Sequence, residues 1–343
     1  MSQQKMTRGD LLRKLFASYQ DPQQFQKFAD ILIGEEESRN NRAFATALRK
    51  ALASARAVAA PSLAPKPSLS ALPREPDKGF GLAEITSGTH KTPKDIVLSS
   101  KNSSAFRRIL NEFRKGDLIR KHGLPVISKI LFVGPPGCGK TLAAELLAKQ
   151  VSLPLVTVRL DTLVSSYLGE TSANLRRIFE FADSTPCVLF LDEFDAVARS
   201  RSDENEHGEL RRVVNSLLQL IDRFGGKGFL VAATNHEDKL DSAVWRRFDE
   251  IIFFDKPGDE EISQLLKMKL KNFPTTFAPP SKASQFLGFS HAEIERVCQN
   301  AIKATLLEGK RELSEPLLDY AITLEKTRRE VVTRVSHNSI PGE

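Results

Sequence analysis

The sequence has few cysteines, no long apolar run and no leader-like beginning. Its three cysteines, Cys138, Cys187 and Cys298, are far apart, and no two of them form a C-x-x-C pair. This argues against a disulfide framework and a zinc site, and it indicates a reducing compartment. No stretch of about 18 apolar residues could span a membrane, and the N-terminus has no apolar segment of the secretory type. We therefore expect a cytoplasmic protein without a membrane partner.

Positive charge is concentrated in the first part of the chain. The net charge is +7, but residues 1–130 contain 23 Lys and Arg against 12 Asp and Glu, whereas residues 131–343 contain 27 against 31. Such an asymmetry is found with nucleic-acid or acidic partners, and more often it reflects only a solvated surface. Acidic residues interrupt the basic ones, as in GEEES (34–38), and no series of stacking aromatics accompanies them.

Helical and strand-like segments follow one another in a defined order. The first sixty residues have apolar side chains at helical spacing, and residues 61–76 contain five prolines, which is typical of a semi-rigid tether. After Pro257 the pattern is helical again. Between these regions, five short apolar runs predict an α/β core with a parallel sheet covered on both faces: KILFVG (129–134), LPLVTVRL (153–160), CVLFLDE (187–193), GFLVAATN (228–235) and EIIFFDKP (250–257).

A glycine-rich turn joins an apolar strand to a helix in LFVGPPGCGKTLAAELLAK, which begins at Leu131. Its spacing, G-x-x-x-x-G-K-[ST], lets backbone N–H groups approach phosphate oxygens, while the lysine reaches the β- and γ-phosphates and the hydroxyl holds Mg²⁺. The N-terminus of the following helix adds the positive end of its dipole. The predicted site for a nucleoside triphosphate and Mg²⁺ consists of Gly134, Pro135, Pro136, Gly137, Cys138, Gly139, Lys140, Thr141 and Leu142.

Polar side chains follow two further strands of the predicted sheet. Asp192 and Glu193 end the run CVLFLDE, and Asn235 ends GFLVAATN. The carboxyl ends of strands in an open α/β sheet face the ligand crevice, where Asp192 can hold Mg²⁺ and Glu193 can polarise the attacking water. The Asn235 amide can orient that water or sense the γ-phosphate, although Thr-Asn also ends many ordinary strands.

Two adjacent arginines, Arg246 and Arg247, follow in DSAVWRRFDE (241–250). Because they are adjacent, they cannot both point into their own crevice. Either can serve a neighbouring subunit as an arginine finger, which neutralises charge in the transition state of phosphoryl transfer. A surface ion pair with Asp249 or Glu250 explains the same residues equally well.

Residues 92–328 resemble the AAA family of ring ATPases, as a bacterial-type single AAA module of the AAA-plus superfamily. GPPGCGKT is similar to Walker A, VLFLDE to Walker B, AATN to sensor 1, and LDSAVWRRFDE to the arginine-finger region. The resemblance implies hydrolysis of ATP with Mg²⁺ by a homo-oligomer, a hexamer. It assigns a helical N-terminal docking or adaptor module (1–60), a Pro-rich linker (61–90), a P-loop NTPase α/β core (91–257), a C-terminal helical lid (258–330) and a flexible tail (331–343).

The resemblance also implies a pore. LVSSYLGETSANLRRIFEFA (163–182) is similar to the first pore loop of the family, with Tyr167, Leu168 and Gly169 as the tip that grips a polypeptide in the ring's channel. Residues 200–209 fall where a second pore loop would lie.

Two segments depart from the family pattern. In the lid, His291-Ala292-Glu293 stands where family members commonly have Gly-Ala-Asp, and we expect His291 and Ala292 beside the ribose or adenine. The arginine segment is shorter than the common R-x-G-R-F-D form, so the resemblance does not select between the two arginines.

Three functions are compatible with these patterns. The first is an ATP-driven remodeller, a hexameric ring that threads protein clients past Tyr167. The second is an ATP-switched module on nucleic acid, which would use the basic first part of the chain. The third is an ATP-dependent scaffold for a separate protease or effector, because the chain has no Gly-x-Ser-x-Gly or His-Glu-x-x-His signature of its own.

Overall fold

The computed structural model describes residues 31–33, 83–86, 92, 95–160, 168–198, 208–237 and 240–338. The chain divides into two compact units, Met1–Pro65 and Lys66–Glu343. In the first unit, residues 31–33 are helical, and the rest of the expected N-terminal module lies outside the described residues.

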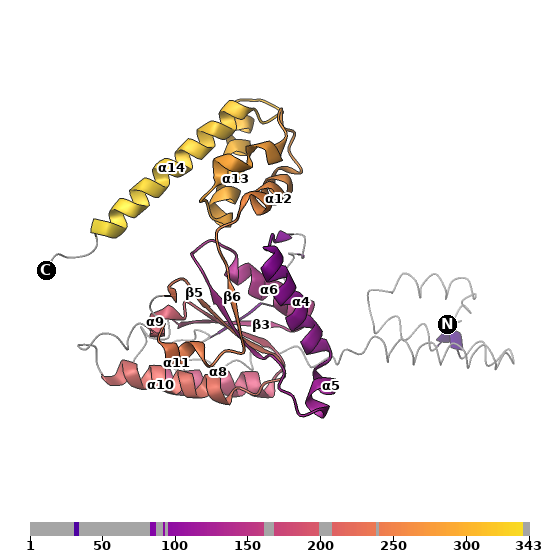
Figure 1. Ribbon diagram of the computed structural model, residues 1–343, viewed down its shortest axis with the longest axis vertical. Helices are drawn as coiled ribbons and strands as arrows, with labels where there is room; N and C mark the ends of the chain where they lie inside the picture. Colours follow the sequence, from indigo (N-terminus) through magenta and orange to yellow (C-terminus); the bar gives the residue numbers. More distant parts are fainter. Residues whose placement is uncertain are drawn as a thin grey trace, which may run out of the picture. The chain divides into compact units, whose positions relative to one another are not determined.

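Within the described part of the second unit, six strands form one sheet (Figure 1). They are β1 (Glu84–Thr86), β2 (Lys129–Val133), β3 (Leu155–Arg159), β4 (Val188–Asp192), β5 (Phe229–Thr234) and β6 (Glu250–Phe253). Their spatial order is β1-β3-β4-β5-β2-β6, and every pair from β3 to β6 is parallel. Near-continuous runs of Val, Leu, Ile and Phe suit strands that are covered on both faces. The five predicted strands are confirmed.

The sequence does not predict strand β1. Residues 61–90 were expected to be a linker, but Glu84–Thr86 pairs antiparallel with β3, from Glu84 opposite Thr157 to Thr86 opposite Leu155. The expected linker is therefore wrong at its C-terminal end, and the sheet is mixed rather than purely parallel. Three residues are too few to show the alternation by which a strand is recognised.

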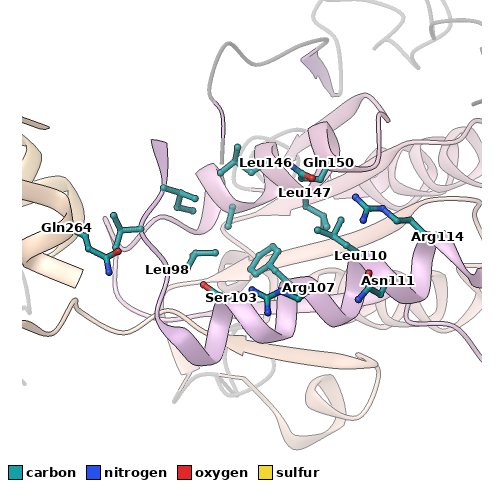
Figure 2. A pocket seen from close by; sticks show the side chains of 14 residues that line it. Leu98, Ser103, Arg107, Leu110, Asn111, Arg114, Leu146, Leu147, Gln150 and Gln264 are labelled. Carbon is teal, nitrogen blue, oxygen red and sulfur yellow. The ribbon is translucent and has the colours of Figure 1, made fainter. Parts of the chain in front are cut away.

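Helices cover both faces of the sheet (Figure 1). On one face lie α4 (Ser100–Arg114) and α6 (Lys140–Gln150), which are seen closely in Figure 2; on the other lie α8 (Leu168–Ser184) and α10 (Gly208–Arg223). Because side chains alternate along a strand, each central strand supplies both cores. In β2, Phe132 belongs to the core under α4 and α6, whereas Leu131 belongs to the core under α8 and α10.

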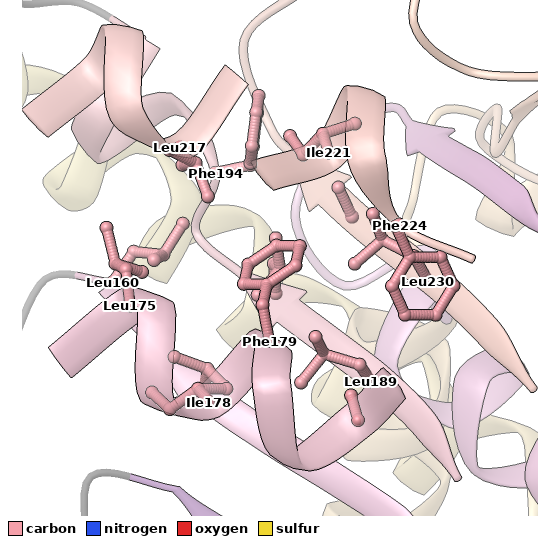
Figure 3. Packing of buried hydrophobic residues seen from close by; sticks show 14 of the residues in the cluster. Leu160, Leu175, Ile178, Phe179, Leu189, Phe194, Leu217, Ile221, Phe224 and Leu230 are labelled. Atoms are coloured by element: carbon pink, nitrogen blue, oxygen red, sulfur yellow. The ribbon is translucent and has the colours of Figure 1, made fainter. Parts of the chain in front are cut away.

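The core under α8 and α10 is filled by aromatic and aliphatic side chains (Figure 3). Phe179 and Phe224 meet edge to face with ring centroids 6.3 Å apart. Phe194 and Phe248 do the same at 6.1 Å. Such pairs contribute about 0.5–1.5 kcal/mol each beyond the burial of their area. Phe194 immediately follows Asp192-Glu193, so this packing anchors the segment that carries the two acidic residues.

The open edge of the sheet, strand β6, is covered by α4. The Asn102 amide donates a hydrogen bond to the Phe253 carbonyl at 2.8 Å. Arg108, six residues further along α4, pairs with Glu250 at 2.6 Å. The helix is thereby fixed to both ends of the strand.

Short helices connect the remaining strands, and a helical subdomain follows β6. The connecting helices are α5 (Gly116–Lys121), α9 (Asp195–Ala198) and α11 (Ser242–Trp245). The helical subdomain contains α12 (Asp259–Leu270), the 3₁₀ helix η5 (Pro279–Phe286), α13 (His291–Leu307) and α14 (Glu315–Asn338) around a core of its own. No helix among the described residues is long and apolar enough to cross a membrane.

The last helix is longer than the sequence analysis suggests. Residues 331–343 were expected to be a flexible tail, but α14 continues to Asn338, so this boundary is wrong. No glycine or proline occurs between Pro316 and Pro341, and extending an existing helix costs little compared with starting one. Inside the subdomain, the buried Glu325 carboxylate binds Arg296 at 2.5 Å and Arg328 at 3.1 Å, which joins α14 to α13.

Candidate functional site

The loop between β2 and α6 wraps around the N-terminus of α6. Gly134, Gly137 and Gly139 all have positive φ angles, of 146°, 76° and 92°. A Cβ atom on Gly134 would lie 2.2 Å from the Phe254 carbonyl oxygen, so no other residue fits this position. The loop therefore keeps the tight, side-chain-poor path that phosphate binding requires.

Lys140 is buried at the first position of α6, with 7% of its surface exposed. Its ammonium donates hydrogen bonds to the carbonyls of Gly134 at 2.6 Å and Pro135 at 3.0 Å, and to Asn235 Oδ1 at 2.7 Å. Burial lowers the pKa of Lys140, and the charges of Cys138 and Asp192 act in the opposite direction. Two predicted site residues from distant parts of the chain, Lys140 and Asn235, are thus in direct contact.

The two predicted Mg²⁺ ligands also lie together. Thr141 Oγ1 is 3.4 Å from Asp192 Oδ2, and the other Asp192 oxygen accepts the backbone N–H of Glu193 at 2.9 Å. Among the described residues, no group of three or more His, Cys, Asp and Glu side chains forms a metal-binding cluster. A hydroxyl and one carboxylate fit Mg²⁺, which takes few protein ligands and completes its shell with phosphates and water.

Glu193 stands directly after β4 in an unusual backbone conformation. Its φ is +53°, a region that residues other than glycine rarely adopt. Its side chain is exposed. A strain of about 1–3 kcal/mol is characteristic of such positions, which cluster at functional sites. The predicted catalytic base is therefore accessible and is held by the turn that follows Asp192.

The sequence analysis missed Asp195, which is buried beneath the site. Its carboxylate accepts the Thr234 hydroxyl at 3.3 Å, and Thr234 Oγ1 in turn accepts the backbone N–H of His236 at 3.1 Å. These bonds tie the end of β5, on both sides of Asn235, to the segment after β4. The sequence did contain a signal for Asp195, because it is the third acidic residue of DEFD, which directly follows an apolar strand.

The two arginines have different surroundings. Arg247 Nε donates to Asp222 Oδ2 at 3.1 Å, and its guanidinium also bonds the Ala243 carbonyl. Arg246 is exposed at the end of α11, where its backbone N–H donates to the Val244 carbonyl, and its side chain has no ion pair or hydrogen bond with any described residue.

The alternative explanation of the arginines, an ion pair with the acids that follow them, is not found in the described structure. Asp249 accepts the backbone N–H groups of Ser128 and Lys129, each at 2.9 Å. Glu250 pairs with Arg108. Arg246 therefore remains available for a contact outside its own chain.

The helical subdomain meets the phosphate loop at the start of α13. The Ala292 N–H donates to the Gly137 carbonyl at 3.0 Å. The His291 ring lies beside the backbone of Val97, and its Nδ1 is buried without a partner among the described residues. Burial is the main reason that the pKa of His291 is lowered. Both predicted lid residues thus border the site.

Of the remaining residues predicted for the site and the pore, some belong to the described structure and others do not. Cys138 is buried, which raises the pKa of its thiol and makes it a poor target for oxidation. Leu142 is half-buried in the first turn of α6, and Pro136 is exposed. Leu168 and Gly169 begin α8. Tyr167 and most of the second expected pore loop, residues 200–207, lie outside the described residues.

Comparisons with known proteins match the core that carries this site. A family model described as "ATPase family associated with various cellular activities (AAA)" matches residues 130–256. An uncharacterized AAA family ATPase, y4kL, from Sinorhizobium fredii is 49% identical over 326 residues, which is 94% of this chain and 97% of that protein. The crystal structure of the FIGL-1 AAA domain in complex with ADP has a similar fold, with a TM-score of 0.59 and 21% identity, over 70% of this chain and 86% of that chain.

Proposed function

The chain belongs to the AAA family of ATPases, and we propose that it couples ATP hydrolysis to the remodelling of other proteins within a homo-oligomeric ring, a hexamer. Hydrolysis of ATP is the activity of the family. The observation that carries the proposal is the meeting of Lys140, Thr141, Asp192 and Asn235 at the carboxyl ends of three neighbouring strands, β4, β5 and β2. That edge of an open α/β sheet is where ligands bind.

Each residue of the site has a separate task in hydrolysis. The loop N–H groups and Lys140 bind the phosphates, and Thr141 and Asp192 would hold Mg²⁺, whose charge offsets that of the phosphates. Glu193 accepts a proton from water as the water oxygen bonds to the γ-phosphorus and the bond to ADP breaks. Asn235 orients that water. Its contact with Lys140 supports this role, because the amide then lies beside the group that binds the γ-phosphate.

Arg246 is the finger that completes the site of a neighbouring subunit. Arg247 is held by Asp222 and the Ala243 carbonyl, whereas Arg246 is exposed and has no partner among the described residues. An arginine supplied in trans makes hydrolysis depend on assembly. This supports a ring in which each active site lies between two copies.

Movement of the lid transmits hydrolysis to the client. The bond from Ala292 to Gly137 joins the lid to the phosphate loop, so changes at the phosphates act on α13. His291 and Ala292 would then contact the base or ribose. We assign the client-gripping tip to Tyr167, Leu168 and Gly169, of which Leu168 and Gly169 begin α8.

The further parts of the proposal concern location and partners. Cys138, Cys187 and Cys298 are all free and buried, which supports a reducing compartment, the cytoplasm. The N-terminal module, residues 1–60, would dock a client or a partner effector such as a protease.

A substrate trap tests the proposal. Tagged Glu193→Gln protein, loaded with ATP, is retained on its clients and compared with a matched trap that also carries Tyr167→Ala. Proteins lost from the second trap are threaded clients, and proteins retained by both are docking partners. Retention of nucleic acid, or of the same proteins by both traps, would contradict threading and favour the nucleic-acid switch or the scaffold.

A further inference from the structure

A groove of about 440 Å³ runs between α4 and α6, away from the phosphate loop (Figure 2). None of the described residues that line it belongs to the phosphate loop. Its floor is apolar and includes the buried side chains of Phe106, Leu146 and Leu147. A volume of this size is in the range of ligand-binding sites, about 300–1,000 Å³.

Both charged side chains that line the described part of the groove are arginines. Arg107 and Arg114 are seven residues apart, two turns along one side of α4, and both are exposed. Neither forms an ion pair with a described residue, although the neighbouring Arg108 pairs with Glu250 and Arg120 pairs with Asp117. The groove therefore has two positive charges along its rim, and no carboxylate of a described residue lines it.

The shape of the groove fits a peptide segment. Its wall on α4 extends from Ser103 to Arg114, about 16 Å at 1.5 Å per residue. Exposed amide side chains, Asn111, Gln150 and Gln264, complete the rim. An amphipathic helix lays apolar residues spaced three and four apart into such a groove. Carboxylates on its flanks would then meet Arg107 and Arg114.

One wall of the groove is also in contact with the nucleotide site. In segment 96–98, Ile96 and Leu98 pack with the core under α4 and α6, whereas Val97 packs with the core of the helical subdomain. The backbone of Val97 lies beside the ring of His291. At the same end, Gln264 of α12 brings the helical subdomain into the rim (Figure 2). A ligand in the groove would touch both bodies that enclose the nucleotide.

We propose that the groove between α4 and α6 is a docking site for an acidic amphipathic segment of a partner protein. The segment places apolar side chains on Leu110, Leu146 and Leu147 and carboxylates on Arg107 and Arg114. Because it contacts segment 96–98 and Gln264, it changes the position of the lid and hence nucleotide turnover. Docking does not depend on the threading of clients, and it stands if Tyr167 has no role.

Fluorescence anisotropy with the full-length protein tests this inference. The probe is a labelled helical peptide, about four turns long, with leucines at i, i+3, i+4 and i+7 and glutamates beside them. Matched peptides carry glutamine or lysine in place of every glutamate. The acidic peptide should bind roughly tenfold or more tightly than the glutamine peptide, and added salt should weaken it. The lysine peptide should not bind.

Charge-reversal variants locate the binding. Arg107→Glu with Arg114→Glu should weaken the acidic peptide roughly tenfold or more, whereas Lys101→Glu with Lys121→Glu, the same change of charge outside the groove, should not. Unchanged thermal unfolding and basal ATPase rates show that both variants are folded. Saturating peptide should change kcat or KM for ATP of the wild type but not of the arginine variant.

Three results would overturn the proposal. One is equal binding of the acidic and glutamine peptides, or binding that survives Arg107→Glu with Arg114→Glu. Another is binding of single-stranded DNA that needs both arginines while the peptide does not bind. The third is a change in sedimentation of the arginine variant without peptide, which would make the groove a contact between copies of this chain.

Discussion

The Lys140 ammonium lies 2.7 Å from the Asn235 amide oxygen, although 95 positions separate them in sequence. The contact joins the start of α6, where we propose that the phosphates bind, to the end of strand β5. Because Asp195 and Thr234 fix that strand end from below, Asn235 has little freedom to move with the lysine. Substitutions at the two positions should therefore have separable effects.

Lys140→Ala should weaken ATP binding roughly a hundredfold or more, since it removes the buried cation. Asn235→Ala should instead lower kcat about a hundredfold with a small change in KM, because an amide that orients water acts mainly in the transition state. Titration with a fluorescent ATP analogue and steady-state kinetics separate the two. An Asn235→Ala variant with an altered KM and normal kcat would contradict the assignment.

Glu193→Gln should bind ATP normally and lower kcat by about 10²–10⁴, the contribution of a general base. The matched control is Glu180→Gln on α8, which removes an exposed carboxylate outside the site. ATP hydrolysis by purified protein is the measurement. Turnover that survives in Glu193→Gln would assign the base to another residue.

Arg246→Ala should lower turnover by roughly 10³ and leave thermal stability unchanged, as expected for a finger used in trans. Arg247→Ala should lower stability by about 1 kcal/mol, since it removes the bonds to Asp222 and the Ala243 carbonyl.

Mixing inactive subunits tests whether Arg246 acts in trans. Arg246→Ala subunits supply intact phosphate loops, and Lys140→Ala subunits supply intact fingers, so a mixture should regain part of the activity. No recovery in mixtures that assemble would place the arginine in its own site.

Gly134→Ala should destabilise the fold by about 3 kcal/mol or more, because the added Cβ would lie 2.2 Å from the Phe254 carbonyl oxygen. Gly123→Ala is the matched control: its φ is also positive, at 72°, but nothing lies within 4 Å of the added atom. It should cost only about 1 kcal/mol of backbone strain. Urea unfolding compares the two, and equal losses would show that the contact with Phe254 is relieved at no cost.

Alkaline pH should destabilise the protein through its buried thiols. Burial raises the pKa of Cys187 and of Cys298 to about 12, from 9.0. The native state then keeps protons that the unfolded state loses, so stabilisation present below pH 9 is lost as the pH rises toward about 12. Each thiol should contribute about 1.4 kcal/mol per pH unit to this fall. Cys298→Ala should reduce the slope of unfolding free energy against pH, and an unchanged slope would contradict the shift.

The sequence predicts the five parallel strands and the phosphate loop because both are encoded locally. Each strand is one apolar run, and the loop is one motif between a strand and a helix. The sequence does not predict strand β1, because three residues are too few to show the alternation of apolar and polar side chains that identifies a strand. The sequence also does not predict the extension of α14 beyond residue 330. A segment of mostly polar residues with a few exposed valines has the same pattern in an exposed helix and in an unstructured tail.

Long-range contacts account for what the sequence leaves open in the site. The choice between Arg246 and Arg247 depends on Asp222, which is 25 residues away in the chain. The support that Asp195 gives to Asn235 depends on β4 and β5 being neighbours. Neither fact can be derived from spacing, because a motif gives residue types in order and not the partner that each one meets.

Both edges of the sheet have features that disfavour the addition of further strands. On one edge, β1 is short and runs antiparallel to the strand beside it. On the other, Asn102 occupies a carbonyl of β6, and Arg108 is tied to Glu250 at its start. Exposed strand edges promote aggregation when many copies of a protein meet. In the proposed ring, such edges would keep neighbouring copies from pairing strand to strand, and they would thereby disfavour growth of the sheet into fibres.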